Sequence, residues 1–91
     1  MRFKENQISI ELLKIAVWKL HGKEIVRIFK FKDFVKSIAF VQKVAVLAEK
    51  FNHHPDILIR YNRVTLRLTT HDEGGLTEKD FHFAEQINLM K

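Results

Sequence analysis

The side chains best suited to chemistry in this sequence are three of its five histidines, His53, His54 and His71. Imidazole both donates and accepts a proton near neutral pH, so it can serve as a general acid or a general base. Pro55 follows the adjacent pair and disfavours helical geometry at His54. The pair should therefore leave the end of a helix on a stiffened path. Two imidazoles there, facing a third on a nearby strand, would form an acid/base pocket.

Each histidine taken alone also has a structural explanation. His53 at a helix C-terminus would be favoured by the helix dipole. His54 before proline could simply mark the helix end, and His71 could lie on the surface. Three histidines could also bind zinc, but two of the ligands would be adjacent in sequence rather than four apart on one helix face. The combination of all three favours an acid/base site without a metal.

Composition limits the classes of protein that the chain could be. A length of 91 residues predicts one domain, residues 1–91, and the absence of cysteine excludes disulfides and thiolate chemistry. No apolar run approaches the roughly 20 residues of a membrane span, and residues 1–6 lack the apolar core of a secretion signal. We therefore expect a cytoplasmic protein that does not bind membranes. The net charge is +5, but the cations are dispersed, which favours a solvated surface over nucleic-acid binding.

The first half of the chain predicts a short helix, a β-hairpin and a long helix. Residues 7–14 form the short helix, with Ser9 as a candidate N-cap. Residues 15–20 and 24–31 are strand-like and flank a turn at residues 21–23. Asp33 is a suitable N-cap for the long helix, which should end at Phe51 or Asn52. Its apolar stripe is predicted to contain Phe34, Ile38, Val41, Ala45 and Ala48, broadened by Val35, Val46 and Leu47.

The second half predicts two strands and a final helix. Residues 57–60 and 64–70 are the strands, joined by a tight connection at residues 61–63. Their alternation places Val64, Leu66 and Leu68 on one face, and a strand reaching residue 71 would put His71 on the other. After a loop at residues 74–75, Thr77 and Asp80 have the spacing of a capping box. The last helix should bury Phe83, Ala84, Ile87 and Met90.

The order α-β-β-α-β-β-α predicts an α+β fold. Two hairpins separated by a helix suggest one four-stranded antiparallel sheet with the helices packed on one face. The opposite face of the sheet would then stay open or meet a partner.

A longer pattern surrounds the three histidines. Its segments are Glu49-Lys50-Phe51-Asn52-His53-His54-Pro55-Asp56, Tyr61-Asn62-Arg63-Val64, Thr69-Thr70-His71 and Gly75-Leu76-Thr77-Glu78-Lys79-Asp80, with Trp18 and Phe31-Lys32-Asp33-Phe34 upstream. In this order and at this spacing the pattern resembles the pterin-4a-carbinolamine dehydratase family. The resemblance implies the same four-stranded fold. It also implies dehydration of 4a-hydroxytetrahydrobiopterin to quinonoid dihydrobiopterin and water, in tetrahydrobiopterin recycling, by homodimers or homotetramers that use no metal or organic cofactor.

The resemblance also assigns roles to residues of this chain. The implied catalytic residues are His53 and His71 as the acid/base pair, in an order left open, and His54 as the residue that holds the substrate. Glu49 precedes His53 by one helical turn and could orient an imidazole. Two departures from the family pattern, Asn52 in place of Asp and Ile57 in place of an aromatic residue, should affect substrate affinity more than chemistry. The implied substrate-binding residues are Glu49, Asn52, His53, His54, Thr69, Thr70, His71, Asp72 and Asp80.

A second hypothesis is a protein-interaction module without enzymatic activity. Related domains act as dimerisation cofactors of a transcription factor, and an open sheet face would suit a protein partner. Subunits could pair through the sheet edge or through the surface of the helix predicted at residues 34–51.

Overall fold

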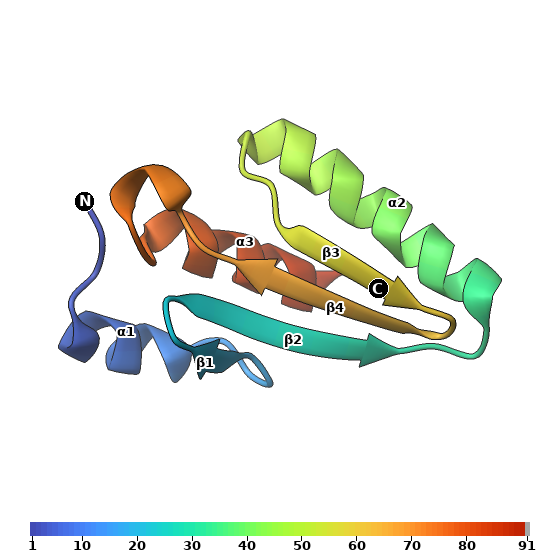
Figure 1. Ribbon diagram of the computed structural model, residues 1–91, viewed down its shortest axis with the longest axis horizontal. Helices are drawn as coiled ribbons and strands as arrows, with labels where there is room; N and C mark the ends of the chain where they lie inside the picture. The colour runs from blue at the N-terminus through green and yellow to red at the C-terminus, as the bar shows by residue number, and fades with distance from the viewer. Residues whose placement is uncertain (91) are drawn as a thin grey trace.

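The computed structural model describes residues 1–90 (Figure 1). Its order of helices and strands is the predicted one, α-β-β-α-β-β-α, with a short 3-10 turn before the last helix. The elements are α1 (Glu5–Leu12), β1 (Lys19–His21), β2 (Glu24–Lys30), α2 (Phe34–Phe51), β3 (Asp56–Arg60), β4 (Arg63–Leu68), the 3-10 turn His71–Glu73 and α3 (Glu78–Leu89). None of the described helices is long and apolar enough to cross a membrane.

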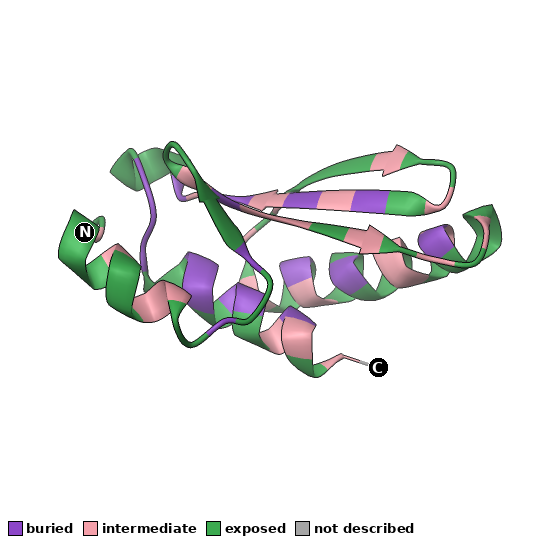
Figure 2. Ribbon diagram, turned by 90° about the horizontal axis from the view of Figure 1, so that it is seen from below, coloured by how far each residue is buried: buried purple, intermediate pink, exposed green. Residues whose placement is uncertain are grey.

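The four strands form one antiparallel sheet in the order β1-β2-β4-β3. The central pair is set by the register Ile25 opposite Leu68 and Phe29 opposite Val64. All three helices lie on the same side of this sheet (Figure 2). The α+β fold with helices on one face, predicted from the sequence, is therefore confirmed.

The core lies between the sheet and the helices. Along β4, Val64, Leu66 and Leu68 are fully buried and alternate with partly exposed residues, as the period of two predicted. From the other side, α3 supplies a buried stripe that includes Phe83 and Ile87. Burying these side chains is the main favourable contribution to folding in a chain of this size.

The ends of α2 follow the predicted cap chemistry. The Asp33 side chain accepts a hydrogen bond from the Lys36 backbone N–H at 2.9 Å, which confirms the N-cap. Asn52 ends the helix in the left-handed conformation, with φ of 49°. Asparagine tolerates this conformation, and the following His53 N–H turns back to the Ala48 carbonyl at 3.1 Å. The helix therefore stops just before the histidine pair.

The predicted apolar stripe of α2 is partly wrong. The buried residues are Ser37, Val44 and Ala48, whereas Phe34 and Ala45 are exposed. Apolar residues occur on two faces of this helix, so steps of three and four can be traced along either of them. Packing against β4 and α3 selects the face, and no periodicity within the helix contains that information.

The N-terminal segment also differs from the prediction. Helix α1 begins at Glu5 behind Lys4, and Ser9 lies inside it with its hydroxyl bonded to the Glu5 carbonyl. Most of the segment predicted as a strand at residues 15–20 is irregular, because Val17 has a φ of 76°. Trp18 is buried in the core but does not belong to a strand, because β1 begins at Lys19.

The end of the last strand is shorter than predicted. Strand β4 ends at Leu68, and Thr70 then pairs only with Gly75 through an isolated bridge. His71 starts the 3-10 turn. Its predicted place on a strand face is therefore wrong, since two glycines in the following loop close the chain into a turn.

The two faces of the sheet should differ in their tolerance of truncation. Leu66→Ala removes a fully buried side chain, so we expect a loss of about 2–5 kcal/mol in the free energy of unfolding. Leu58→Ala is the matched control, because Leu58 lies on the neighbouring strand facing the opposite side and is 52% exposed. Urea denaturation of both variants measures the difference. Equal losses would contradict the placement of the core.

Candidate active site

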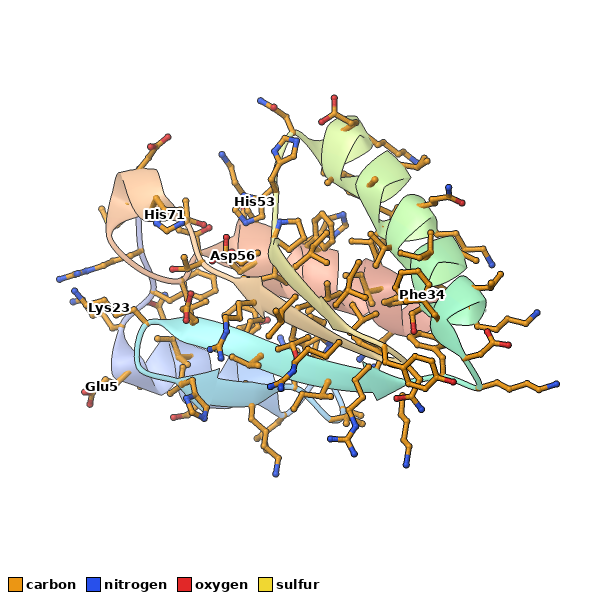
Figure 3. All side chains as sticks on the ribbon, turned by 45° about the vertical axis from the view of Figure 1, so that its right-hand side comes forward. Glu5, Lys23, Phe34, His53, Asp56 and His71 are labelled. Carbon is orange, nitrogen blue, oxygen red and sulfur yellow. The ribbon has the colours of Figure 1, made fainter. Side chains whose placement is uncertain are left out.

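A hollow of about 300 Å³ lies where the end of α2, the end of β4 and the 3-10 turn meet. All three histidines singled out in the sequence border it, together with five other side chains. The lining residues are Asn52, His53, His54, Thr69, Thr70, His71, Asp72 and Lys79. Figure 3 shows His53 after the end of α2 and His71 in the connection that leads to α3. The fold thus brings together residues 52–54 and residues 69–72, which are separate segments of the sequence.

The turn that carries His71 is closed by backbone hydrogen bonds. The Glu73 N–H donates to the Thr70 carbonyl and the Gly74 N–H to the His71 carbonyl, both at 3.0 Å. Gly74 adopts a φ of 72°, a conformation that glycine takes without a Cβ penalty. Thr70 and Gly75 then exchange two backbone hydrogen bonds, which ties the turn to the end of the sheet. His71 is therefore exposed but carried on a backbone of defined shape.

His53 is held by a buried carboxylate. Its Nε2 lies 2.6 Å from Asp80 Oδ1, with 11% of the His53 side chain and none of the Asp80 side chain exposed. The other carboxylate oxygen, Oδ2, accepts hydrogen bonds from the Thr70 hydroxyl at 2.8 Å and from the Thr77 backbone N–H at 2.9 Å. The Thr77 bond is one half of the predicted capping box, which the structure confirms. Asp80 therefore caps α3 and orients His53 at the same time.

These contacts assign a tautomer to neutral His53. An ionised carboxylate has no proton to donate, so Asp80 accepts a hydrogen bond from the Nε2–H of the ring. Nδ1 then carries the lone pair, and it has no hydrogen-bond partner within residues 1–90. A carboxylate behind an imidazole also stabilises the ring when it takes up a proton. The arrangement suits a base that uses Nδ1.

His54 has a different environment. Its Nε2 lies 2.6 Å from Glu49 Oε2, but both side chains are largely exposed, at 56% and 80%. A contact between two exposed side chains of this kind contributes little to stability. Glu49 therefore orients His54 and not His53. The prediction for His53 assumed that the helix continues to residue 53, but the left-handed conformation of Asn52 ends it at residue 51.

Seven of the predicted substrate-binding residues border the hollow, and two do not. Glu49 and Asp80 stand behind the histidines as their hydrogen-bond partners. Sequence reasoning missed Lys79, which lies between the two capping-box residues and borders the hollow. It also missed the Thr77 hydroxyl, which is 2.8 Å from that of Thr70. The capping box could have suggested Lys79, because Asp80 was predicted to bind the substrate and Lys79 precedes it in the first turn of α3.

The described side chains do not form a metal-binding cluster. Within residues 1–90, no group of three or more His, Cys, Asp or Glu side chains is arranged to hold a metal ion. The chemistry open to this site is proton transfer by imidazole, with a carboxylate behind one ring.

Comparison with known proteins identifies the family. The sequence model for pterin 4 alpha carbinolamine dehydratase matches residues 1–90. A protein of Sulfolobus acidocaldarius, provisionally named a pterin-4-alpha-carbinolamine dehydratase, is 46% identical over 91 residues and is covered along its full length. The chain therefore belongs to the pterin 4 alpha carbinolamine dehydratase family.

Two solved structures resemble the fold. A Brucella melitensis protein described as a transcriptional coactivator/pterin dehydratase superposes with a TM-score of 0.91 at 39% identity, covering 97% of this chain and 96% of the other. A pterin dehydratase-like protein described as a RuBisCO assembly factor in the alpha-carboxysome gives a TM-score of 0.68 at 25% identity, covering 80% and 87%. The fold thus also occurs in proteins whose descriptions name roles in transcription and assembly.

The buried hydroxyl behind Asp80 should matter for stability. Thr70→Val keeps the side chain's shape but removes a donor to the carboxylate, so we expect the free energy of unfolding to fall by about 1–3 kcal/mol. Thr69→Val is the matched control, because the Thr69 hydroxyl donates to the Lys23 carbonyl at an exposed position where water can replace it. We expect a loss below about 1 kcal/mol there. Urea denaturation that gave the same loss for both variants would contradict the network around Asp80.

Proposed function

We propose that this protein is a 4a-hydroxytetrahydrobiopterin dehydratase that works by histidine general acid/base catalysis. The observation that carries the proposal is the shared hollow, where His53, backed by Asp80, and His71 border the same space. Membership of the dehydratase family and the name of the Sulfolobus relative support it. The substrate would be a reduced pterin with a hydroxyl on the carbon next to a ring nitrogen.

The reaction requires two proton transfers. A base removes the proton from the ring nitrogen while an acid protonates the leaving hydroxyl. The C–O bond breaks, a C=N double bond forms in the ring, and water leaves. One group must therefore accept a proton and another must donate one. Such assistance contributes typically 10²–10⁴-fold in rate, or about 3–5 kcal/mol of barrier.

We assign the base to His53 and the acid to His71. His53 Nδ1 has the lone pair in the tautomer that Asp80 selects, and Asp80 stabilises the imidazolium that forms. His71 is exposed at the rim, so it can be protonated from solvent. After turnover His53 gives up its proton and His71 regains one, so the enzyme returns to its starting state.

The remaining side chains would position the substrate. His54, oriented by Glu49, would hold the ring at the rim of the hollow. Asn52, Thr69 and Asp72 offer donors and acceptors that match the edge of a pterin. The Thr70 hydroxyl is already used by Asp80, so Thr70 would act through the carboxylate and not on the substrate.

The acid/base pair can be tested by stopped-flow measurement of 4a-hydroxytetrahydropterin dehydration. We expect His53→Ala and His71→Ala each to lower the rate by about 100-fold or more, because each removes one proton-transfer group. His21→Ala is the matched control, since His21 is an exposed histidine on β1, outside the hollow. It should leave the rate unchanged. Wild-type protein that does not accelerate dehydration over buffer would contradict the dehydratase proposal itself.

A second function, assembly with another protein copy, is favoured by the exposed face of α2. Val35 and Val46, which lie three turns apart on the same side of the helix, are 72% and 68% exposed, and Phe34 beside them is 50% exposed. We propose that this face pairs with a second copy of the chain to give a homodimer or homotetramer. The coactivator and assembly roles named for the two structural relatives are consistent with a protein-binding surface on this fold.

Self-association through α2 predicts that one charge on this face will separate the subunits. Val46→Glu should shift the protein to a monomer in sedimentation analysis, because a buried carboxylate without a partner is costly. Leu89→Glu is the matched control, since Leu89 is also 68% exposed but lies on α3. It should leave the oligomer intact. Wild-type protein that sediments as a monomer, or two variants with the same effect, would contradict this interface.

A further inference from the structure

The proposed acid, His71, has no side-chain contact that fixes its position. Its imidazole is exposed and makes no hydrogen bond, ion pair or ring contact within residues 1–90. His53, by contrast, is held by Asp80 at 2.6 Å. A general acid works only when it lies within hydrogen-bond reach of the group that it protonates. The position of His71 therefore depends on the backbone that carries it, which is the loop at residues 71–76.

This loop is bonded both to the sheet and to the N-terminal segment. Gly75 exchanges two backbone hydrogen bonds with the chain at the end of the sheet. The carbonyls of its two neighbours accept from the N-terminal segment instead. Arg2 Nη1 donates to the Gly74 carbonyl at 3.2 Å, and the Phe3 N–H donates to the Leu76 carbonyl at 2.6 Å. Figure 1 shows the N-terminal segment, in blue, beside the orange connection that leads to α3.

Side-chain packing supports both hydrogen bonds. The aliphatic part of Arg2 lies over Gly75, where an added Cβ would be 3.4 Å from Arg2 Cδ. The Phe3 ring stacks on the Phe81 ring, with centroids 5.8 Å apart and an angle of 23° between the planes. Phe81 is buried near the start of α3. The N-terminal segment thus holds the loop at residues 71–76 against the helix that orients the other histidine.

We propose that Arg2 and Phe3 are positioning residues for His71. The inference rests on the proposed function, in which His71 protonates the leaving hydroxyl. Neither Arg2 nor Phe3 borders the hollow, so both act through the backbone of the loop. Because His53 is oriented from α3 and His71 is carried by the loop, the geometry between acid and base depends on how the loop is held against α3. A displacement of about 1 Å in such a geometry can lower a rate by about 100-fold.

Backbone order in the loop is the first measurement, made by ¹⁵N relaxation on the full chain. We expect residues 71–75 to have order parameters of about 0.85 in the wild type and below about 0.6 in Arg2→Met, which loses the donor to Gly74. Arg2→Lys keeps a cationic donor and should restore the order. Lys4→Met is the matched control, because Lys4 is an exposed cation of the same segment that makes no hydrogen bond to residues 71–76. Equal order in the wild type and Arg2→Met would overturn the inference.

A double-mutant cycle separates the positioning of His71 from general stability. With the acid present, Arg2→Met and Phe3→Leu should each lower kcat for 4a-hydroxytetrahydropterin dehydration by about tenfold or more and leave KM within about twofold, because a misplaced acid weakens only the transition state. In the His71→Ala background the same changes should lower kcat by less than about twofold, because the residue that they position is already gone. Equal losses in the two backgrounds would mean a general structural effect and would overturn the inference.

The two measurements separate the positioning role from the proposed function. Wild-type protein without dehydratase activity would contradict the function, and the order of residues 71–75 would still decide whether the N-terminal segment holds the loop. Active wild-type protein whose kcat is unchanged in Arg2→Met would overturn the positioning role alone.

Discussion

The hydrogen bonds of one buried carboxylate, Asp80, are the interaction on which the rest of the site depends. A carboxylate without solvent contact is costly unless its oxygens find donors. Here those donors come from three places: the His53 ring after α2, the Thr70 hydroxyl after β4, and the Thr77 N–H at the start of α3. Asp80 therefore finds all three donors only if the ends of α2 and β4 and the start of α3 lie together. The hollow bordered by the three histidines lies at this point.

Asp80 both caps a helix and contacts a histidine that borders the hollow. Asp80 is the third helical residue of a capping box, and by that criterion alone it would serve only to begin α3. The structure gives each oxygen a separate task, with Oδ2 serving the cap and the threonine, and Oδ1 facing the imidazole. A carboxylate held by these donors is a rigid support for the imidazole that it faces.

The two ends of α2 have opposite chemical character. At its C-terminal end the lining is polar and titratable, and the rings of His53 and Phe83 meet edge to face. Along its N-terminal half a second hollow is lined by aromatic rings and cations. The same long helix thus borders two hollows, and some of its apolar residues, among them Val35 and Val46, are exposed.

The sequence by itself determined the elements whose signals are local. The Asp33 cap, the helix end at Phe51, the alternation of Val64, Leu66 and Leu68, and the capping box at Thr77 depend on residues a few positions apart, and the structure confirms all four. The spacing of the histidine pattern also pointed to the family that the comparisons identify. These features are readable in a sequence because the physical interactions behind them are short in range.

Only the tertiary structure decided which residues meet across the chain. The pairing of His53 with Asp80 and of His54 with Glu49, the place of His71 in a turn, and the buried face of α2 all depend on contacts between elements. The same holds for Arg27, whose alternation along β2 says that it faces inward but not that it would donate a hydrogen bond to the Asn88 side chain. The physical reason is that packing chooses among faces and partners that local periodicity leaves equivalent.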